Sequence, residues 1–333
     1  MSVKDNVLKV LIDNKGEHFS GEELAERLNV SRNAVWKAVK ILREEGYKIN
    51  GINNKGYCMT EDSDILSKET ICKYIHSDIV DKLDIEVYKS IDSTNTRLKN
   101  MALEGEREWK ILVSEEQTNG RGRMNRNFYS PSGTGIYMSI LLRPDTNSKE
   151  SLFITTMAAV AVADAIEKVM GINTGIKWVN DIYCSGKKVC GILTEAAMDL
   201  ETGKLDYAVL GIGINIRMPQ GGFPEEIRNT VTALCEENKE YIEDLRCKIV
   251  ANVINNISGL YENLEEHSFM KMYREKSVLI GKEVYILGDE SREMMMVEDV
   301  DDNAYLVVRH KDGKIDKLFS GEVSVRMEDN CEK

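Results

Sequence analysis

Glycine and arginine alternate at positions 120–123, where the sequence reads Gly-Arg-Gly-Arg. Apolar runs that end near position 117 and begin at position 136 predict a strand on either side, so these four residues are expected in a loop. Glycines admit left-handed backbone conformations in which successive N–H groups converge on an anion, and arginines add guanidinium groups at the same place. Such a loop suits a reaction that brings a carboxylate and a phosphate together, because their charges repel. A solvated loop with a chance basic run is the alternative.

Residues 92–95 read Asp-Ser-Thr-Asn and follow a predicted strand at 85–91. Apolar residues at helical spacing come after them, so helix capping alone would explain Ser93, Thr94 and Asn95. The functional interpretation is that this strand-to-helix turn also points two hydroxyls and an amide toward a small polar ligand.

A second polar group lies at positions 177–181, which read Lys-Trp-Val-Asn-Asp. If this stretch continues a strand, Lys177, Val179 and Asp181 share one face, and Trp178 and Asn180 share the other. An Asn-Asp pair at the end of a strand suits an Mg²⁺ ion that also contacts phosphate oxygens, because Mg²⁺ accepts few carboxylates and keeps waters. A simple turn is the alternative for this pair.

Two further groups are expected near the same sheet edge. A Ser-Gly turn at 185–186 should bring Lys187 and Lys188 back on the adjacent strand. Positions 211–215 read Gly-Ile-Gly-Ile-Asn and follow a strand predicted at 207–211. Their glycines permit close approach of another group, and Asn215 is expected to be exposed at the edge. The third glycine and the following helix of a dinucleotide site are missing, which excludes that interpretation.

The first 60 residues are expected to form a winged helix-turn-helix. Ser20 and Glu23 make a capping box for one short helix, and Ser31 is a suitable N-cap for the next, which Gly46 should end. Segments 47–49 and 56–59 flank a turn and read as a hairpin, the wing. Groups suited to base edges and phosphates lie on the exposed face of the second helix, namely Ser31, Arg32, Asn33, Trp36, Lys37 and Lys40. A three-helix protein-interaction module is the alternative.

Composition separates a slightly basic first part from an acidic remainder. The chain has 333 residues, 42% of them hydrophobic, and a formal net charge of −12. This predicts two or three folded domains and argues against general nucleic-acid binding. Residues 1–60 hold ten Lys/Arg and eight Asp/Glu, a net charge of +2, so the remainder carries −14. DNA contact at one end is compatible with that distribution.

Several classes are not expected from the sequence. It has no apolar run of about 18 residues and no signal sequence, so a cytoplasmic protein without a membrane partner is expected. Its seven cysteines form no C-x-x-C pair and its four histidines are isolated. A zinc centre or a histidine-based catalytic centre is therefore not predicted.

The elements that must position the polar groups come in a mixed order. Helices are expected at 67–74 and 151–170, and the pattern is helical again from 232 to about 276. Central strands are expected at 85–91, 111–115, 135–142, 175–181, 191–195 and 207–211. Five short strands at 283–287, 294–300, 305–309, 314–319 and 323–326 predict a small barrel, with Met294, Met295 and Met296 as strand core. The predicted fold class is α+β multidomain.

The order of these motifs behind a winged helix is typical of one family. The sequence resembles the bifunctional biotin protein ligase and biotin operon repressor family over nearly its whole length. The resemblance implies a winged-helix DNA-binding domain at 1–62 and a linker with a leading helix at 63–82. It also implies a mixed α/β catalytic domain of the biotin/lipoate ligase type at 83–276 and an SH3-like β barrel at 277–333. The sequence departs from a common form of the pattern at Asn125, Phe128 and Val179, where glycine, tryptophan and proline are frequent.

The resemblance further implies roles for individual residues. The biotin site would comprise Ser93, Thr94, Asn95, Gln117, Arg121, Gly122, Arg123 and Lys188. Of these, Arg123 and Lys188 would be the catalytic pair at the reacting carboxylate and phosphate. ATP would be bound by Arg123, Arg126, Lys177, Asn180 and Asn215, and Asp181 would lie at its Mg²⁺.

The implied reaction has two steps. The biotin carboxylate attacks the α-phosphate of ATP to give biotinoyl-AMP and pyrophosphate. A lysine amine of a biotin carboxyl carrier domain, such as that of acetyl-CoA carboxylase, then displaces AMP. The family also implies a ligand-favoured homodimer that binds operator DNA at two half-sites. A biotin-sensing transcription factor without catalysis, and a ligase for lipoate or another small acid, are the alternatives.

Overall fold

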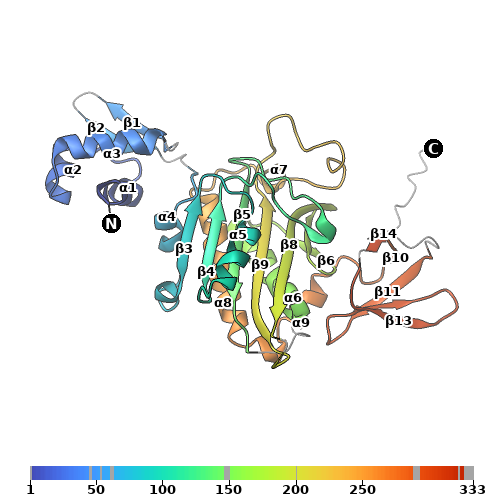
Figure 1. Cartoon of the computed structure of the whole chain (residues 1–333). Coiled ribbons are helices and arrows are strands. Elements are labelled where there is room, and N and C mark those ends of the chain that lie inside the picture. Colours follow the sequence, from blue (N-terminus) through green and yellow to red (C-terminus); the bar gives the residue numbers. More distant parts are fainter. Residues whose placement is uncertain are drawn as a thin grey trace, which may run out of the picture. The chain divides into compact units, whose positions relative to one another are not determined.

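The chain divides into two units, one built around helices and one around a large sheet (Figure 1). The computed structural model describes residues 2–44, 47–52, 55–60, 64–145, 151–199, 201–287, 293–321 and 323–325. The first unit consists of residues 1–74 and 241–251, and the second of residues 75–240 and 252–333. Among the described residues, no helix combines the length and the apolar content that crossing a bilayer requires.

The first unit begins with the expected winged helix-turn-helix. Helices α1 (Val3–Asp13), α2 (Gly21–Leu28) and α3 (Arg32–Glu44) precede a hairpin of β1 (Ile49–Ile52) and β2 (Gly56–Met59). Ser20 and Glu23 cap each other's backbone as predicted, and Asn29 ends α2 in a left-handed conformation. The Ser31 hydroxyl accepts from the Ala34 N–H at 3.2 Å, which confirms it as a cap of α3. The predicted stop at Gly46 lies outside the described residues.

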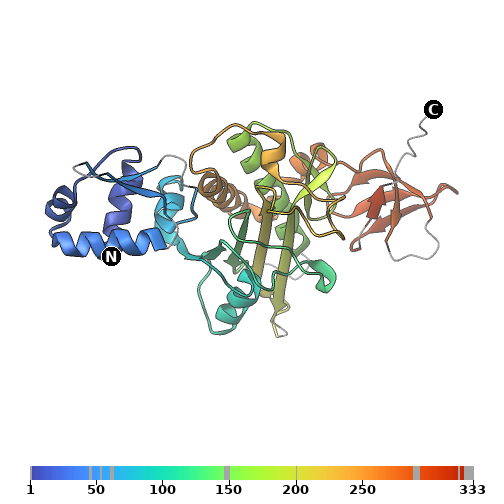
Figure 2. The ribbon, with the colours of Figure 1, turned by 90° about the horizontal axis from the view of Figure 1, so that it is seen from above.

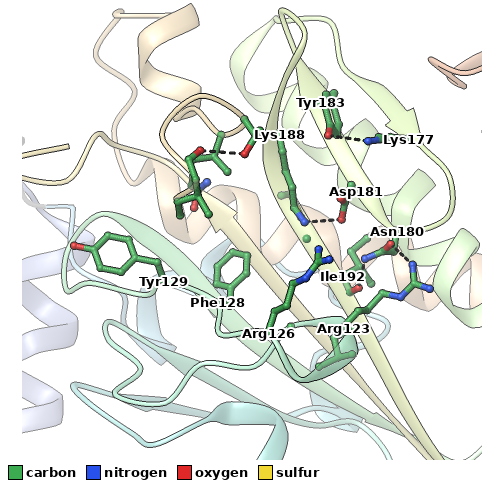
Figure 3. A pocket seen from close by; sticks show the side chains of 18 of the residues that line it. Arg123, Arg126, Phe128, Tyr129, Lys177, Asn180, Asp181, Tyr183, Lys188 and Ile192 are labelled. Atoms are coloured by element: carbon green, nitrogen blue, oxygen red, sulfur yellow. Dashed lines mark hydrogen bonds and ion pairs between the residues drawn. The ribbon is translucent and has the colours of Figure 1, made fainter. Parts of the chain in front are cut away.

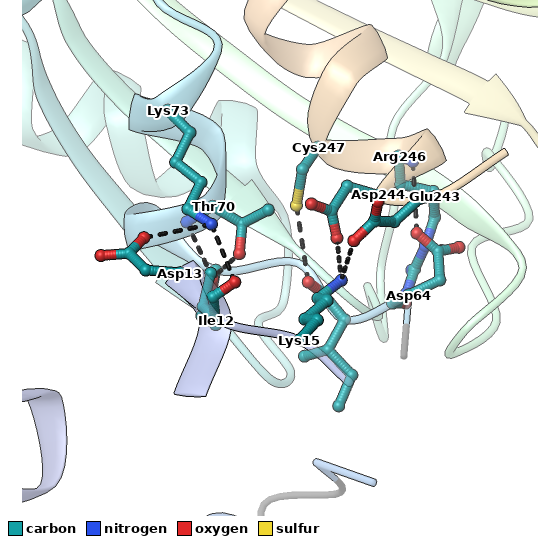
Figure 4. A network of polar contacts seen from close by, with 12 residues as sticks. Ile12, Asp13, Lys15, Asp64, Thr70, Lys73, Glu243, Asp244, Arg246 and Cys247 are labelled. Atoms are coloured by element: carbon teal, nitrogen blue, oxygen red, sulfur yellow. Dashed lines mark hydrogen bonds and ion pairs between the residues drawn. The ribbon is translucent and has the colours of Figure 1, made fainter. Parts of the chain in front are cut away.

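Charged contacts complete the first unit (Figure 4). Helix α4 (Lys68–Lys73), which Ser67 caps, contributes Lys73, whose Nζ donates to the Ile12 carbonyl oxygen at 2.9 Å. The buried Lys15 ammonium pairs with the buried Asp244 carboxylate just before helix α8 (Leu245–Tyr261). The Tyr74 hydroxyl donates to the other Asp244 oxygen at 2.9 Å. Each buried charge at this point therefore has a partner, as burial of charge requires.

The second unit is organised around a seven-stranded sheet in the order β3-β4-β5-β9-β8-β7-β6. Its strands are β3 (Asp84–Tyr88), β4 (Lys110–Ser114), β5 (Gly135–Leu142), β6 (Gly175–Lys177), β7 (Asp181–Cys184), β8 (Lys187–Met198) and β9 (Leu205–Asn215). Strands β3 and β4 are parallel and the other neighbours are antiparallel. Helix α5 (Thr94–Leu103) covers one face, while α6 (Ser151–Met170) and α8 cover the other (Figures 1 and 2). The predicted bounds of β5 and α6 are confirmed.

Helix α5 is held on its face of the sheet by apolar contacts. Leu98 and Ala102 of the helix pack on Leu112, Leu141 and Val209 of three strands. The helix N-terminus is thereby fixed beside β9, and its first residues carry the polar group predicted at 93–95. The remaining helical segments of this unit are η1 (Val80–Lys82), η2 (Arg123–Asn125), α7 (Leu234–Glu237), η4 (Leu264–Glu266) and α9 (Met270–Glu275).

The five C-terminal strands form a separate antiparallel sheet in the order β13-β12-β11-β10-β14. They are β10 (Glu283–Ile286), β11 (Met295–Val300), β12 (Leu306–Arg309), β13 (Ile315–Leu318) and β14 (Val323–Val325), and together they curl into a half-barrel. The prediction that the methionine run is strand core holds for Met295, which is buried. It is wrong for Met296, which points outward because neighbouring residues of a strand face opposite sides.

Three strand predictions were wrong in their extent. The stretch 175–181 is not one strand, because residues 178–180 form a turn between β6 and β7. Lys177 and Asp181 are therefore directly paired across a hairpin. Strand β9 continues through residues 211–215, so its glycines lie inside the sheet and not beyond it. Strand β3 ends at Tyr88, three residues earlier than predicted.

Candidate active site

The Gly-Arg-Gly-Arg loop lies between β4 and β5, as expected, but its glycines are not left-handed. Gly122 has φ −123° and ψ 179°, and the left-handed residues are Met124 (φ 53°) and Asn125 (φ 57°). A Cβ on Gly120 would lie 2.5 Å from the Phe128 carbonyl oxygen. The loop folds back on itself, with the Gly122 N–H donating to the Arg126 carbonyl at 2.7 Å. These glycines thus serve close approach between the two arms of the loop.

Five cationic side chains from three elements line one cavity (Figure 3). Arg121, Arg123 and Arg126 come from the loop, Lys177 from β6 and Lys188 from β8. The cavity has a volume of about 270 Å³. The sequence placed these cations at one edge of the sheet, and the structure brings them together around a common space.

Two of the cations are paired with polar side chains of the β6–β7 hairpin. Lys188 Nζ lies 2.7 Å from Asp181 Oδ1. Arg123 Nη1 donates to Asn180 Oδ1 at 2.7 Å, and Asn180 Nδ2 donates to the Ile192 carbonyl at 2.8 Å. The turn between the two strands, which contains a cis Trp178–Val179 peptide, therefore presents one carboxylate and one amide to the cavity.

Metal binding at this point has to rest on one carboxylate. No group of three or more His, Cys, Asp or Glu side chains able to hold a metal occurs among the described residues. A magnesium ion that arrives with a nucleotide needs only one or two carboxylates, since phosphate oxygens and waters complete its shell. The single Asp181 carboxylate is enough for such a nucleotide-bound magnesium ion. It is not enough for a resident metal held by protein side chains alone.

A smaller cavity, which we call the amide-lined cavity, adjoins the cationic one and is lined mostly by uncharged side chains. Ser93, Thr94, Asn95 and Gln117 face it, and the two cavities share Arg121, Phe128, Gly191 and Leu193 as lining residues. Gln117 Oε1 accepts from the Thr94 N–H at 2.9 Å and from its hydroxyl at 3.0 Å. Ser93 also caps α5 by accepting from the Thr96 N–H at 3.4 Å. Capping therefore accounts for Ser93 but not for Thr94 or Asn95, and all three line this cavity.

The glycines of β9 make room for this smaller cavity. A Cβ on Gly211 would lie 2.0 Å from Asn95 Oδ1, and one on Gly213 would lie 2.5 Å from the Phe128 ring. The expected close approach is confirmed. Asn215, by contrast, is buried and donates to the Thr232 carbonyl at 3.2 Å. Its predicted exposure was wrong because β9 lies in the middle of the sheet, although Asn215 does line the cationic cavity.

Comparison with known proteins gives both a family and a fold. Residues 87–215 match the Biotin/lipoate A/B protein ligase family, and residues 4–58 match an HTH domain. The Bifunctional ligase/repressor BirA of Bacillus spizizenii is 31% identical over 97% of this chain and 99% of its own length. The chain belongs to the BirA family of bifunctional ligase/repressors.

A second relative and a solved structure agree with that assignment. BirA of Escherichia coli is 27% identical over 97% of this chain and 99% of its own length. The structure of Aquifex aeolicus biotin protein ligase in complex with biotin and ATP superposes with a TM-score of 0.58 at 29% identity. It covers 73% of this chain and 98% of the Aquifex chain. The expected family and fold class are thus confirmed.

The DNA-reading residues expected of a BirA family member lie in the first unit. Ser31, Arg32, Asn33, Trp36, Lys37 and Lys40 are all exposed, at the start and along one face of α3. Lys40 Nζ lies 5.8 Å from the centre of the Trp36 ring, and Arg32 lies 3.8 Å from Glu22. Helix α3 thus presents a continuous polar and basic face, as the spacing predicted.

Two polar residues of the site were missed from the sequence. Ser139 Oγ lies 2.7 Å from Thr94 Oγ1 and 2.6 Å from Asn95 Oδ1. Glu195 Oε2 accepts from Asn95 Nδ2 at 3.2 Å. Ser139 carried a usable signal, because it is a polar residue inside the apolar run of β5. Glu195 carried none, because the Asn95 side chain that it contacts is 100 positions away in the sequence.

Proposed function

We propose that this protein activates biotin with ATP and transfers it to a lysine of a biotin carboxyl carrier domain. The observation that carries the proposal is the pair of adjoining cavities, one with five cations and one with uncharged amides and hydroxyls. Biotin has an uncharged bicyclic head and a carboxylate tail, and ATP brings three phosphates. The cationic cavity would screen both anions, and the amide-lined cavity would take the head.

The first step joins two negatively charged groups. A biotin carboxylate oxygen forms a bond to the α-phosphorus of ATP, the bond to the β-phosphate oxygen breaks, and pyrophosphate leaves with the electron pair. Lys188, Arg121 and Arg123 would hold the carboxylate and the α-phosphate, because fixed cations stabilise the charge that develops there. Arg126, Lys177, Asn180 and Asn215 would hold the rest of the nucleotide. The Mg²⁺ that accompanies ATP would supply further charge screening, with Asp181 as its carboxylate.

The second step breaks the mixed anhydride. The acceptor lysine amine attacks the biotin carbonyl carbon, the bond to the AMP oxygen breaks, and AMP leaves while the amine loses a proton. No protein nucleophile is needed in either step. Burial raises the pKa of the Cys190 thiol well above its usual range, so this cavity-lining cysteine stays protonated and unreactive.

A biotin-responsive repressor activity is the second half of the proposal. The exposed face of α3, with Arg32, Asn33 and Lys37 near its N-terminal end, is suited to base edges and phosphates in a major groove. Reading a two-fold symmetric operator would require a homodimer, which the adenylate would favour. Replacing Lys37 and Lys40 by Ala should weaken operator binding and flatten its salt dependence while leaving ligation unchanged. Unaltered binding by that variant would contradict the assignment.

One experiment tests the enzymatic proposal directly. The purified protein is incubated with biotin, ATP and Mg²⁺, and biotinoyl-AMP and pyrophosphate are measured before and after addition of a carrier domain. Formation of the adenylate followed by labelling of the carrier supports the proposal. Biotin binding without pyrophosphate release would instead indicate a non-catalytic biotin sensor. Adenylation of lipoate in preference to biotin would indicate a ligase for a different acid.

A further inference from the structure

Glu195 contacts a residue that lines the amide-lined cavity and an arginine of the loop. It lies on β8, and its carboxylate contacts side chains from two other elements. Oε2 accepts from Asn95 Nδ2 at 3.2 Å, and Oε1 lies 3.4 Å from Lys99 Nζ and 3.8 Å from Arg121 Nη1. One carboxylate therefore contacts both a residue of the expected biotin head site and an arginine of the expected anion site.

These contacts are part of a longer run of polar side chains. Successive members are within hydrogen-bonding or ion-pairing distance, in the order Ser130, Gln117, Thr94, Ser139, Asn95, Glu195 and Arg121. The run starts and ends in the segment between β4 and β5, so this segment closes it into a ring. Glu195 is the member that joins the buried Asn95 amide to the Arg121 guanidinium group.

The chemistry of a carboxylate gives this position a defined effect on Asn95. An ionised carboxylate only accepts hydrogen bonds, so it requires the NH₂ group of the Asn95 amide to face β8. The Leu193 carbonyl, at 3.4 Å from the same nitrogen, imposes the same direction. Asn95 Oδ1 is thereby turned to Ser139. The donor and acceptor sides of the amide are thus fixed before any ligand binds, which lowers the cost of binding.

We propose that Glu195 is a positioning residue for biotin, a role that rests on the function proposed above. It orients the Asn95 amide, and it holds the Arg121 guanidinium beside the amide-lined cavity until the ligand's own carboxylate takes its place. Arg121 exchanges one carboxylate for another, so the ligand meets a pre-arranged cation. An uncharged analogue of the same shape, such as biotin amide, would have no carboxylate with which to displace Glu195.

The test is Glu195→Gln in the full-length protein, because glutamine keeps the shape of the side chain and loses the charge and the fixed acceptor character. The KM for biotin is expected to rise about 10-fold or more, the scale of one lost hydrogen bond to a charged group, with kcat within about 2-fold. The matched control is Glu167→Gln. Glu167 also binds a lysine, Lys276 at 2.6 Å, in the same unit but away from the two cavities, and its variant should keep the KM of the wild type.

A double-mutant cycle separates positioning from general damage. If Glu195 acts through Asn95, then Glu195→Gln should raise the KM much less in an Asn95→Ala background than in the wild type. Fully additive effects, or an unchanged KM in the single variant, would overturn the proposal. Glu195→Asp withdraws the carboxylate from Asn95 by one methylene and should also raise the KM, which keeps the test decisive if Glu195→Gln does not fold. A wild-type protein that makes no biotinoyl-AMP would overturn the proposed function itself, an outcome distinct from a normal KM in the variant.

Discussion

One ion pair of the first unit and one of the cationic cavity differ in how exposed their side chains are. Lys15 and Asp244 side chains are 6% and 5% exposed, whereas Lys188 and Asp181 are 28% and 23% exposed. A sealed pair cannot exchange its partner without leaving a charge in a low-dielectric environment. A partly exposed pair can, because water and an incoming anion compensate the partner that is released. Sealed pairs therefore fix structure, and accessible pairs are suited to chemistry.

The largest effect is expected from breaking the sealed pair. Asp244→Ala leaves the buried Lys15 ammonium without its closest partner and the Tyr74 hydroxyl without its acceptor. The free energy of unfolding should fall by about 3 kcal/mol, measured by urea denaturation monitored by circular dichroism. The matched control is Glu243→Ala, whose carboxylate is 45% exposed and 3.6 Å from the same ammonium. It should cost less than about 1 kcal/mol, and equal losses in the two variants would refute the distinction.

The next effect concerns the accessible pair. Lys188→Ala should slow adenylate formation on the order of 10²-fold, because one preorganised charge donor is lost, and should change stability little. Single-turnover release of pyrophosphate measures the rate. Lys187→Ala, which removes the exposed neighbour on the same strand, is the control and should behave as the wild type. Normal pyrophosphate release by Lys188→Ala would remove this lysine from the proposed catalytic pair.

A smaller effect is expected at Arg123, the second arginine of the Gly-Arg-Gly-Arg loop. Arg123→Ala loses the hydrogen bond to Asn180 and one cation of the cavity. The adenylate should then dissociate about 10-fold faster, in line with the loss of one charge-assisted hydrogen bond. A pulse-chase with labelled biotin measures its release. Retention equal to that of the wild type would show that Arg123 does not hold the adenylate.

The smallest effect extends the comparison to a partly buried histidine, whose side chain is 15% exposed. Glu293, and then Asp316, raise the pKa of His310 above its usual value by accepting from the ring at 3.0 Å. A raised folded-state pKa means that the stabilisation is fully present below the unfolded pKa of about 6.5 and is lost as pH rises through the folded value. His310→Gln should therefore lower Tm slightly at pH 6 and not at pH 9. A loss of the same size at both pH values would exclude the ion pairs as its cause.

The fold was predictable from the sequence wherever the hydrophobic pattern was long. The apolar runs of β5 and α6 gave their bounds because each spans many residues with one periodicity. The prediction for 175–181 failed because seven residues fit a strand and a hairpin equally well. The predicted exposure of Asn215 failed for a different reason. Its burial depends on the strands that pair on both sides of β9, and the local sequence does not determine strand order.

The cations of the site were predictable from the sequence, and the ring of polar side chains was not. The five basic residues carry their charge wherever they are placed, so a motif can find them. The glycines of the loop were assigned the wrong role, because the groups that crowd Gly120 belong to Phe128 and Ser130 on the returning arm. Glu195 contacts Asn95 across 100 positions of sequence, a separation that no local pattern reveals.

Residues 241–251 belong with the first unit although they lie far along the chain, and this matters to anyone who divides the protein into fragments. A fragment that stops near residue 60 would contain Lys15 without Asp244, and the complementary fragment would contain Asp244 without Lys15. Each fragment would expose to water a charge that is buried in the intact chain. We expect both fragments to be less soluble and more easily proteolysed than a chain expressed whole, and point substitutions in α3 are the better tool for separating DNA binding from ligation.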